Sequence, residues 1–102
     1  MKTYRIEFID EAEKEFKELD KSQRLLVLKQ IVKLEMSPYY GKPLGNKKGI
    51  DLTGFYKLYA DKKKIRIVYT VTDDTVKIIA ISKRENFEAY IRAAQRIKHI
   101  IE

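Results

Sequence analysis

The sequence has 102 residues, 44% of them hydrophobic and 36% charged, which is the size and balance of one folded domain. It contains no cysteine and one histidine, which excludes a disulfide framework, a thiol nucleophile and a metal site rich in cysteine or histidine. Residues 1–36 are charge-neutral, so the whole net charge of +7 falls in residues 37–102, where it favours either polyanion binding or an ordinary solvated face.

A strand is expected over residues 3–9, because hydrophobic and charged side chains alternate there. Asp10 offers an N-cap, and Glu13 completes a capping-box pattern, so a first helix is expected to follow. The acidic residues of this helix alternate with lysines, which predicts a solvated helix face with ion pairs, formed by Glu11, Lys14, Glu15, Lys17 and Glu18.

A second helix is expected from about Gln23 to Ser37. Residues 20–22 provide a short break with a new cap, and Pro38 ends the helix because the residue before a proline disfavours helical backbone. The two helices form an antiparallel hairpin. One side of the second helix is expected to be lined by apolar residues, namely Leu25, Leu28, Ile31 and Val32.

All four glycines and both prolines fall within residues 38–54, which predicts a long loop. Three β-branched and aromatic runs with short turns between them then predict an antiparallel meander, over residues 55–60, 65–72 and 76–82. Side chains alternate along a strand, so Lys57 and Arg66 are expected to share the face away from the helical hairpin.

A third, amphipathic helix is expected from a cap at Asn86 to residue 101. Its apolar stripe has helical spacing, through Phe87, Ile91, Ala94, Ile97 and Ile101. The predicted fold class is therefore α+β: an N-terminal strand and helical hairpin packed on an antiparallel sheet of about four strands, with a C-terminal amphipathic helix, in a single domain over residues 1–102.

The candidate functional residues are a basic set that comes from separate elements: Lys57, Arg66, Lys83, Arg84 and Tyr90. Lysine or arginine on a strand requires a face that meets water or an anion, because burying an unpaired charge is costly. One interpretation is an ordinary polar sheet face. The other is a phosphate site, where arginines hold phosphate oxygens and a tyrosine supplies a titratable hydroxyl.

Several short fragments occur in a familiar order and spacing. They are Tyr4-Arg-Ile-Glu-Phe8, Gly41-Lys-Pro-Leu44, Leu52-Thr-Gly-Phe-Tyr-Lys-Leu58, Ile65-Arg-Ile-Val-Tyr69, Lys83-Arg-Glu-Asn86 and Tyr90. Over residues 4–98 the sequence resembles the RelE/ParE superfamily of toxins from toxin–antitoxin systems, and most of all its RelE branch.

This resemblance implies a helical hairpin packed against a curved antiparallel sheet. It also implies an endoribonuclease that needs no metal or other cofactor and cuts messenger RNA, commonly in the ribosomal A site. The implied partners are a cognate antitoxin, mRNA and the ribosome.

The resemblance also carries roles to individual residues. Lys57 matches a lysine of the catalytic patch, and Arg66, Arg84 and Tyr90 match further members of it. RelE-type enzymes usually place a second basic residue two positions after the first lysine, as a general base, and this chain has Tyr59 there. The expected mechanism is attack of the RNA 2′-hydroxyl on the adjacent phosphate. Arg66 and Arg84 stabilise the developing charge, Lys57 holds phosphate or assists proton transfer, and Tyr59 or Tyr90 exchanges the proton.

Four further lysines are expected to bind RNA around this site: Lys83 after the last strand, and Lys42, Lys47 and Lys48 in the loop. Exposed loop lysines are otherwise simply solvated. The substitution at Tyr59 leaves two other functions open. One is a ParE-like toxin that inhibits DNA gyrase by binding, and the other is an inactive relative that binds its antitoxin.

The cellular location is expected to be cytoplasmic. The longest apolar runs are four residues, far below the roughly 20 that span a bilayer, and no signal-peptide pattern opens the sequence.

Overall fold

The computed structural model describes residues 2–47, 49–83 and 88–101. Their elements, in chain order, are β1 (Arg5–Phe8), α1 (Asp10–Glu18), α2 (Lys21–Lys33), β2 (Lys42–Pro43), β3 (Asn46–Lys47), β4 (Ile50–Asp51), β5 (Phe55–Ala60), β6 (Ile65–Thr72), β7 (Thr75–Lys83) and α3 (Glu88–Ile101). The predicted α+β class is confirmed, with a helical hairpin after the first strand and a helix at the C-terminal end.

The main sheet has the strand order β1-β7-β6-β5-β2. Strands β5, β6 and β7 form the predicted antiparallel meander, and β1 pairs with β7 in parallel. The sheet has five strands rather than about four, because β2 forms inside the expected loop and pairs with β5. The rest of that loop contains the small β3–β4 hairpin.

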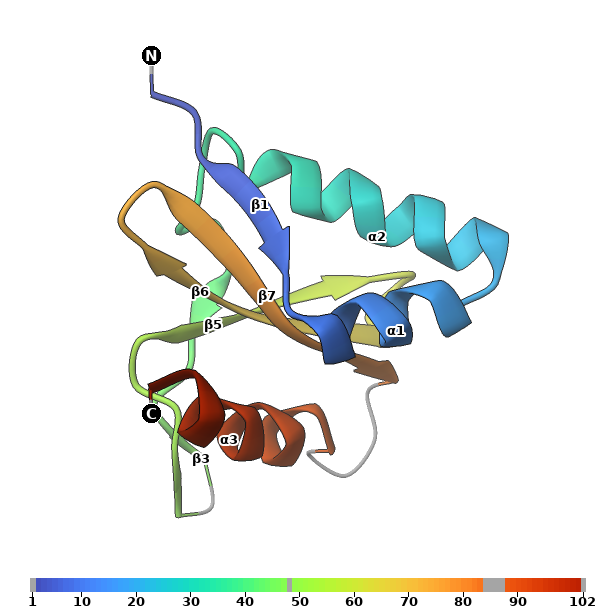
Figure 1. Cartoon of the computed structure of the whole chain (residues 1–102). Helices are drawn as coiled ribbons and strands as arrows, with labels where there is room; N and C mark the ends of the chain where they lie inside the picture. Colours follow the sequence, from blue (N-terminus) through green and yellow to red (C-terminus); the bar gives the residue numbers. More distant parts are fainter. Residues whose placement is uncertain (1, 48, 84–87, 102) are drawn as a thin grey trace.

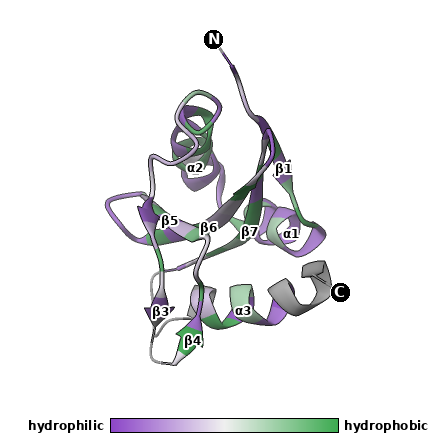
Figure 2. Ribbon diagram, turned by 90° about the vertical axis from the view of Figure 1, so that its left-hand side faces the viewer, coloured by the Kyte–Doolittle hydropathy of each residue, from purple (hydrophilic) through white to green (hydrophobic). Residues whose placement is uncertain are grey.

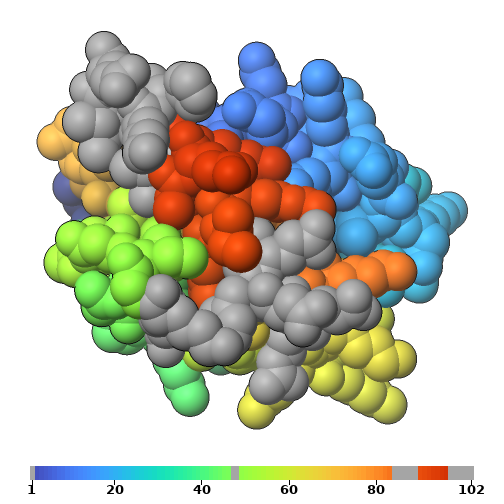
Figure 3. All heavy atoms as spheres, turned by 90° about the horizontal axis from the view of Figure 1, so that it is seen from below, coloured from blue at the N-terminus to red at the C-terminus, as the bar shows by residue number. Residues whose placement is uncertain are grey.

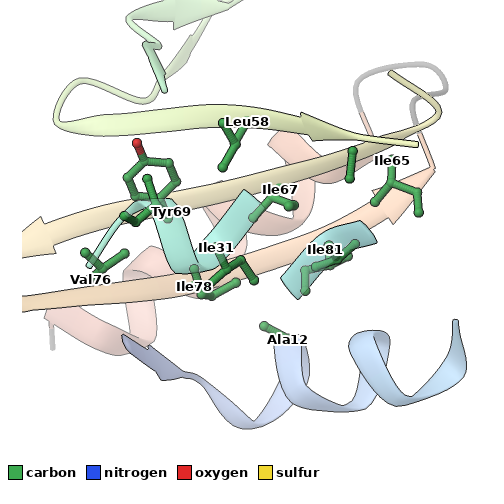
Figure 4. Packing of buried hydrophobic residues seen from close by; sticks show 12 residues of the cluster. Ala12, Ile31, Leu58, Ile65, Ile67, Tyr69, Val76, Ile78 and Ile81 are labelled. Carbon is green, nitrogen blue, oxygen red and sulfur yellow. The ribbon is translucent and has the colours of Figure 1, made fainter. Parts of the chain in front are cut away.

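Helices cover both faces of this sheet. In Figure 1 the α1–α2 hairpin lies on one side and α3 lies below, and the turned view of Figure 2 shows the same three layers. None of the described helices is long and apolar enough to cross a membrane. Apolar side chains of both layers fill the space between the hairpin and the sheet, as in Figure 4: Ala12, Val27, Ile31, Leu34, Leu58, Ile67, Ile78 and Ile81.

A second apolar cluster lies on the other face of the sheet. Tyr90 and Ala93 of α3 pack there against the sheet residues Val68 and Ile79 and against Leu52, which precedes β5. Figure 3, seen from below, shows α3 lying over this face. Because α3 covers the face that carries Lys57 and Arg66, that face is partly enclosed and is not an open polar surface.

Both helices of the hairpin begin earlier than predicted. Ile9, not Asp10, is the N-cap of α1, and its carbonyl accepts a hydrogen bond from the Glu13 N–H, so the predicted capping box is wrong. Helix α2 begins at Lys21, after an Asp20 cap whose side chain accepts the Gln23 N–H. The helix ends at Lys33 and continues only as a turn toward Pro38.

Most of the apolar side expected on α2 faces outward, since Leu25, Leu28 and Val32 are exposed and only Ile31 is buried. The residues that α2 packs into the core are Val27, Ile31 and Leu34. The reason is that α2 carries two apolar stripes on opposite sides, and helical spacing alone does not indicate which of them meets the sheet.

The predicted stripe of α3 is also displaced. Ile91 is 45% exposed, whereas its neighbour Tyr90 is buried, and Ala94 is partly buried. The predicted cap Asn86 and the stripe residue Phe87 lie outside the described residues, as do the side chains of Ile97 and Ile101. Ion pairs from Arg92 and Arg96 to α1, described below, set the rotation of this helix.

Candidate functional site

Strand register places the central residues of the candidate site side by side. Tyr59 of β5 lies directly opposite Arg66 of β6, and Lys57 stands two residues earlier on the same face of β5. On the other side of β5, Lys57 is opposite Lys42 of β2. The alternation in the sequence therefore predicts the shared face of Lys57 and Arg66 correctly.

The Arg66 guanidinium lies between two tyrosine rings. Its central carbon is 4.2 Å from the ring centroid of Tyr90 and 5.7 Å from that of Tyr59. The Lys57 ammonium is 5.4 Å from the Tyr59 centroid. The aromatic faces stabilise these cations and fix their positions. Four of the five residues predicted as catalytic, Lys57, Tyr59, Arg66 and Tyr90, thus form one cluster, called here the Arg66 cluster.

Arg66 itself is 8% exposed, and its buried Nε has no hydrogen-bond partner in the described part of the chain. Buried polar atoms in proteins are normally hydrogen-bonded, and arginine offers donors in a planar fork that matches phosphate oxygens. An unused donor on a nearly buried guanidinium is the arrangement expected of an anion site.

The two tyrosines of the cluster differ in pKa. Burial by itself raises the pKa of the Tyr59 phenol. Hydrogen bonding to Arg66 and Lys57, together with their positive charges, outweighs this effect and lowers the pKa to about 8. Burial dominates at Tyr90 and raises its pKa, although the charges of Arg66 and Lys57 oppose the shift. Near neutral pH, Tyr59 is therefore the phenol that is more readily deprotonated.

A pocket of about 330 Å³ opens beside the cluster. Its lining combines basic and aromatic side chains with backbone, from Tyr40, Gly41, Lys42, Lys57, Leu58, Tyr59 and Lys63. This volume falls within the roughly 300–1,000 Å³ of ligand pockets. Lys63, in the β5–β6 turn, is a lining residue that the sequence prediction missed.

Gly41 fixes the strand that carries Lys42. Its N–H donates a 2.9 Å hydrogen bond to the hydroxyl of the buried Tyr69, and a Cβ here would lie 2.5 Å from the Lys57 carbonyl oxygen. The chain therefore passes close to β5 at a position where only glycine fits. Burial raises the pKa of Tyr69 to about 12, so this hydroxyl stays protonated.

The remaining predicted residues are placed less centrally. Lys83 is exposed at the end of β7 and lies opposite Ile65, so it shares the hairpin face of the sheet with Ile65 and is not on the face of Arg66. Lys47 belongs to β3 in the small hairpin, and its side chain is not described. Arg84 and Lys48 lie outside the described residues. Within the described residues, no group of three or more metal-binding side chains comes together.

Glu15 was expected on a solvated helix face, but in the structure it is mostly buried and has a structural role. Its side chain is 13% exposed and accepts hydrogen bonds at 2.8 Å from Arg92 and from Arg96 of α3, and at 3.1 Å from the Ile81 N–H. Arg96 also donates to the Ile79 carbonyl at 2.8 Å. This group, called here the Glu15 clasp, holds α3, and with it Tyr90, on the sheet. Glu15 is more than 60 residues from each of its partners in sequence, so only the folded structure shows them together.

Comparison with known proteins agrees with the fold. No family model matches the chain. A RelE-like toxin protein from Escherichia coli is 29% identical over 97 residues, which cover 93% of this chain and 98% of that protein. The isolated E. coli RelE toxin has a crystal structure that is 30% identical and covers 92% of this chain and 98% of that chain, with a TM-score of 0.69. RelE in the intact E. coli RelBE toxin–antitoxin complex is 28% identical and covers 81% of this chain and 99% of that chain, with a TM-score of 0.67. The chain therefore belongs to the RelE-like toxin family.

Proposed function

We propose that this chain is the toxin of a type II toxin–antitoxin system and that it cuts messenger RNA without a metal ion. The observation that carries the proposal is Arg66, a nearly buried guanidinium with an unused Nε donor, held between two tyrosines beside Lys57. Membership of the RelE-like family supports it.

In the proposed reaction the RNA 2′-oxygen attacks the adjacent phosphorus while the bond from phosphorus to the 5′-oxygen breaks. The products are a 2′,3′-cyclic phosphate and a 5′-hydroxyl. One proton must leave the 2′-hydroxyl and one must reach the departing 5′-oxygen. Arg66 stabilises the charge that develops on the phosphate oxygens, a contribution worth several kcal/mol in comparable sites.

Tyr59 is the proposed proton acceptor. Its pKa of about 8 makes the phenolate accessible near neutral pH, and the same two cations that lower the pKa would hold the phosphate. This chain would thus use a tyrosine as the general base, where RelE-type enzymes usually use a basic side chain. Lys57, a cation two residues away, is the proposed donor to the leaving oxygen.

Tyr90 is assigned a positioning role. It is buried, its pKa is raised, and its ring lies 4.2 Å from the Arg66 guanidinium carbon, so it orients Arg66 and remains protonated. Arg84 stays a proposed second arginine on the strength of the resemblance. Lys42, Lys83 and the hairpin lysines Lys47 and Lys48 would line the path of the RNA.

The proposed setting is the cytoplasm, with mRNA on the ribosome as substrate and a cognate antitoxin as inhibitor. The RelBE complex supports the antitoxin, since the similar toxin in it is bound to one.

The chemical test uses purified protein and ribosomes that carry a short mRNA, with and without a 2′-deoxy substitution at the cleaved position. We expect cleavage of the RNA to a 2′,3′-cyclic end, no cleavage of the substituted substrate, and a loss of about 100-fold or more in Arg66→Ala. Lys14→Ala, on the outer face of α1, is the control and should cleave normally. Equal cleavage of the 2′-deoxy substrate would rule out the mechanism.

The cellular test maps mRNA ends by primer extension after the chain is induced without an antitoxin, beside an Arg84→Ala variant. New ends within translated codons, absent in the variant, are expected. Growth arrest with no new ends and altered plasmid supercoiling would instead indicate a gyrase inhibitor. No growth effect at all would indicate an inactive relative.

A further inference from the structure

Tyr40 is an exposed aromatic residue that the proposed reaction does not use. Its side chain is 56% exposed, and it lines the pocket of about 330 Å³ beside the Arg66 cluster. Lys42 is paired with Lys57 in the antiparallel β2–β5 pair. Two residues away from this pair on each segment, Tyr40 comes level with Tyr59. An exposed aromatic ring and the proposed proton acceptor therefore line the same pocket.

The backbone on both sides of Tyr40 is held in place. The Tyr40 N–H donates a 3.0 Å hydrogen bond to the Ser37 carbonyl, and the Gly41 N–H donates to the buried Tyr69 hydroxyl at 2.9 Å. The Lys33 ammonium is 5.4 Å from the centroid of the Tyr40 ring, and Lys33 is not among the described residues that line the pocket. This cation therefore holds the ring from outside the pocket. A ligand has little freedom to remove from a residue held in this way, which favours binding.

The β5–β6 turn brings a lysine to the same pocket through a strained backbone. Asp61, Lys62 and Lys63 have φ values of 52°, 54° and 69°, a region that residues other than glycine rarely adopt. The Asp61 side chain accepts a 3.3 Å hydrogen bond from Gln23 of α2, and its carbonyl accepts the Lys64 N–H at 3.0 Å. Backbone strain is concentrated at ligand sites in proteins, and here it places the exposed Lys63 in the pocket lining.

The lining of the pocket matches the two parts of a nucleotide. It includes three lysines and no carboxylate, and lysine binds phosphate as a point charge. The exposed ring of Tyr40 offers a surface on which any base can stack. Proteins that hold single-stranded nucleic acid combine cations with aromatic side chains in this way.

The position of the pocket favours a nucleotide of an RNA strand over a free nucleotide. Lys57 and Tyr59 belong both to the pocket lining and to the Arg66 cluster. A strand with one phosphate at Arg66 therefore has a neighbouring nucleotide within reach of Tyr40. A free nucleotide would fill the pocket without using this continuity.

We propose that this pocket is a nucleotide subsite, in which Tyr40 stacks on a base next to the cleaved phosphate and Lys63 binds the phosphate of that nucleotide. The inference rests on the proposed function, because its ligand is the RNA bound at Arg66. Tyr40 contributes to the affinity through its ring, and Lys63 contributes through its charge.

The test separates the bases of the RNA from its backbone. It compares two labelled oligonucleotides of about six nucleotides, one with bases and one with the same backbone and no bases. Both carry 2′-O-methyl groups, which remove the attacking hydroxyl and prevent cleavage. Fluorescence anisotropy measures the affinity of the full chain for each. Tyr40→Ala should bind the first oligonucleotide about tenfold or more weakly and the second as tightly as the wild type, because stacking requires a base. Lys63→Ala should weaken both by the same factor.

Two further variants serve as controls. Tyr40→Phe keeps the ring and should retain the wild-type affinity for both oligonucleotides. Tyr39→Ala removes the neighbouring exposed tyrosine, which packs against Tyr56 and does not line the pocket, and should leave both affinities unchanged. Because Tyr40 is exposed, Tyr40→Ala should keep the wild-type melting temperature.

Three results would overturn the subsite: unchanged affinity in Tyr40→Ala, an equal loss on both oligonucleotides, or a nucleoside monophosphate that binds as tightly as the RNA and displaces it. The last result would assign the pocket to free nucleotides. Cleavage of ribosome-bound mRNA distinguishes these failures from failure of the proposed function. A wild type that cleaves mRNA while Tyr40→Ala binds RNA normally overturns the subsite alone. A wild type that does not cleave mRNA, but loses affinity in Tyr40→Ala only for the oligonucleotide with bases, overturns the proposed function and supports the subsite.

Discussion

At the scale of single residues, the environment of Tyr59 changes its chemistry more than its identity suggests. A free tyrosine has a pKa of about 10 and is almost fully protonated at neutral pH. Here Arg66 and Lys57 stabilise the phenolate against the opposing effect of burial, and the pKa is about 8. The same side chain in a neutral setting would be a poor proton acceptor, so the proposed role of Tyr59 depends on these two cations.

This assignment predicts the pH dependence of cleavage. The acceptor must be deprotonated, so kcat/KM should rise about tenfold per pH unit below pH 8 and level off above it. In Tyr59→Phe, kcat/KM should no longer rise with pH in this range, and the rate should fall by about 10²–10⁴-fold. Tyr39→Phe, at an exposed tyrosine, should keep the wild-type pH dependence and the wild-type rate. A flat wild-type profile, measured from single-turnover cleavage, would remove Tyr59 from the role.

Gly41 gives a second prediction at this scale. Its added Cβ would lie 2.5 Å from the Lys57 carbonyl oxygen and 2.7 Å from the Tyr69 hydroxyl, so Gly41→Ala must push β2 off β5. The free energy of unfolding should fall by about 1–3 kcal/mol, the usual effect of overpacking. Gly45→Ala meets nothing within 4 Å and should match the wild type or gain up to about 1 kcal/mol. Urea denaturation of both variants checks this, and equal stabilities would show that β2 shifts without cost.

At the scale of elements, predictions from periodicity succeed where one face of an element is unambiguous. Alternation along β5 and β6 places Lys57, Tyr59 and Arg66 correctly, because a strand has only two faces. Periodicity is ambiguous for α2, because this helix has apolar residues on two sides and the spacing does not indicate which side meets the sheet. The short strand β2 was missed because two residues carry no detectable period, and its pairing with β5 depends on contacts distant in sequence.

The Glu15 clasp shows why the position of α3 on the sheet cannot be predicted from periodicity in the sequence. Glu15 is spaced like its exposed neighbours on α1, and nothing local distinguishes it from Glu11 or Glu18. Its partners come from α3 and from the backbone of β7. Tyr90 could therefore be assigned to the candidate site by resemblance, while its contact with Arg66 depends on a clasp that only the fold assembles.

Removing the charge of the clasp should loosen α3. Glu15→Gln keeps the shape but weakens the bonds to Arg92 and Arg96, and hydrogen bonds to charged groups are worth about 1.5–3 kcal/mol. Because Arg92 is partly exposed, a loss near the lower end of that range is expected. Hydrogen exchange should accelerate across α3, and RNA cleavage should fall as Tyr90 leaves Arg66.

Glu11→Gln, at an exposed position of the same helix, is the control and should change neither property. If both variants exchange equally slowly in α3, apolar packing alone holds that helix. If α3 loosens while cleavage stays normal, Tyr90 has no positioning role.

At the scale of the whole molecule, the sheet separates two surfaces of different character. The hairpin side carries the exposed apolar residues Leu25, Leu28 and Val32 of α2, and the other side carries the Arg66 cluster under α3. The excess positive charge, which lies entirely in residues 37–102, belongs to the elements that build the second side and its edge at β5 and β2. The two faces of one sheet therefore differ in chemistry, one apolar and the other basic and aromatic.

The charge distribution predicts how RNA binding responds to salt. Each phosphate neutralised by a lysine or arginine releases counterions, so the logarithm of the affinity should fall linearly with that of the salt concentration. Lys57→Ala and Lys42→Ala should each make the slope shallower by about 0.7, the value per phosphate for single strands. Lys14→Ala removes the same charge from the outer face of α1 and should leave the slope unchanged, because a charge far from the bound strand releases no counterion on binding. Fluorescence anisotropy with a labelled RNA between about 50 and 200 mM salt measures all four proteins. Equal slopes would mean that net charge, and not the face built by β5 and β2, attracts the RNA.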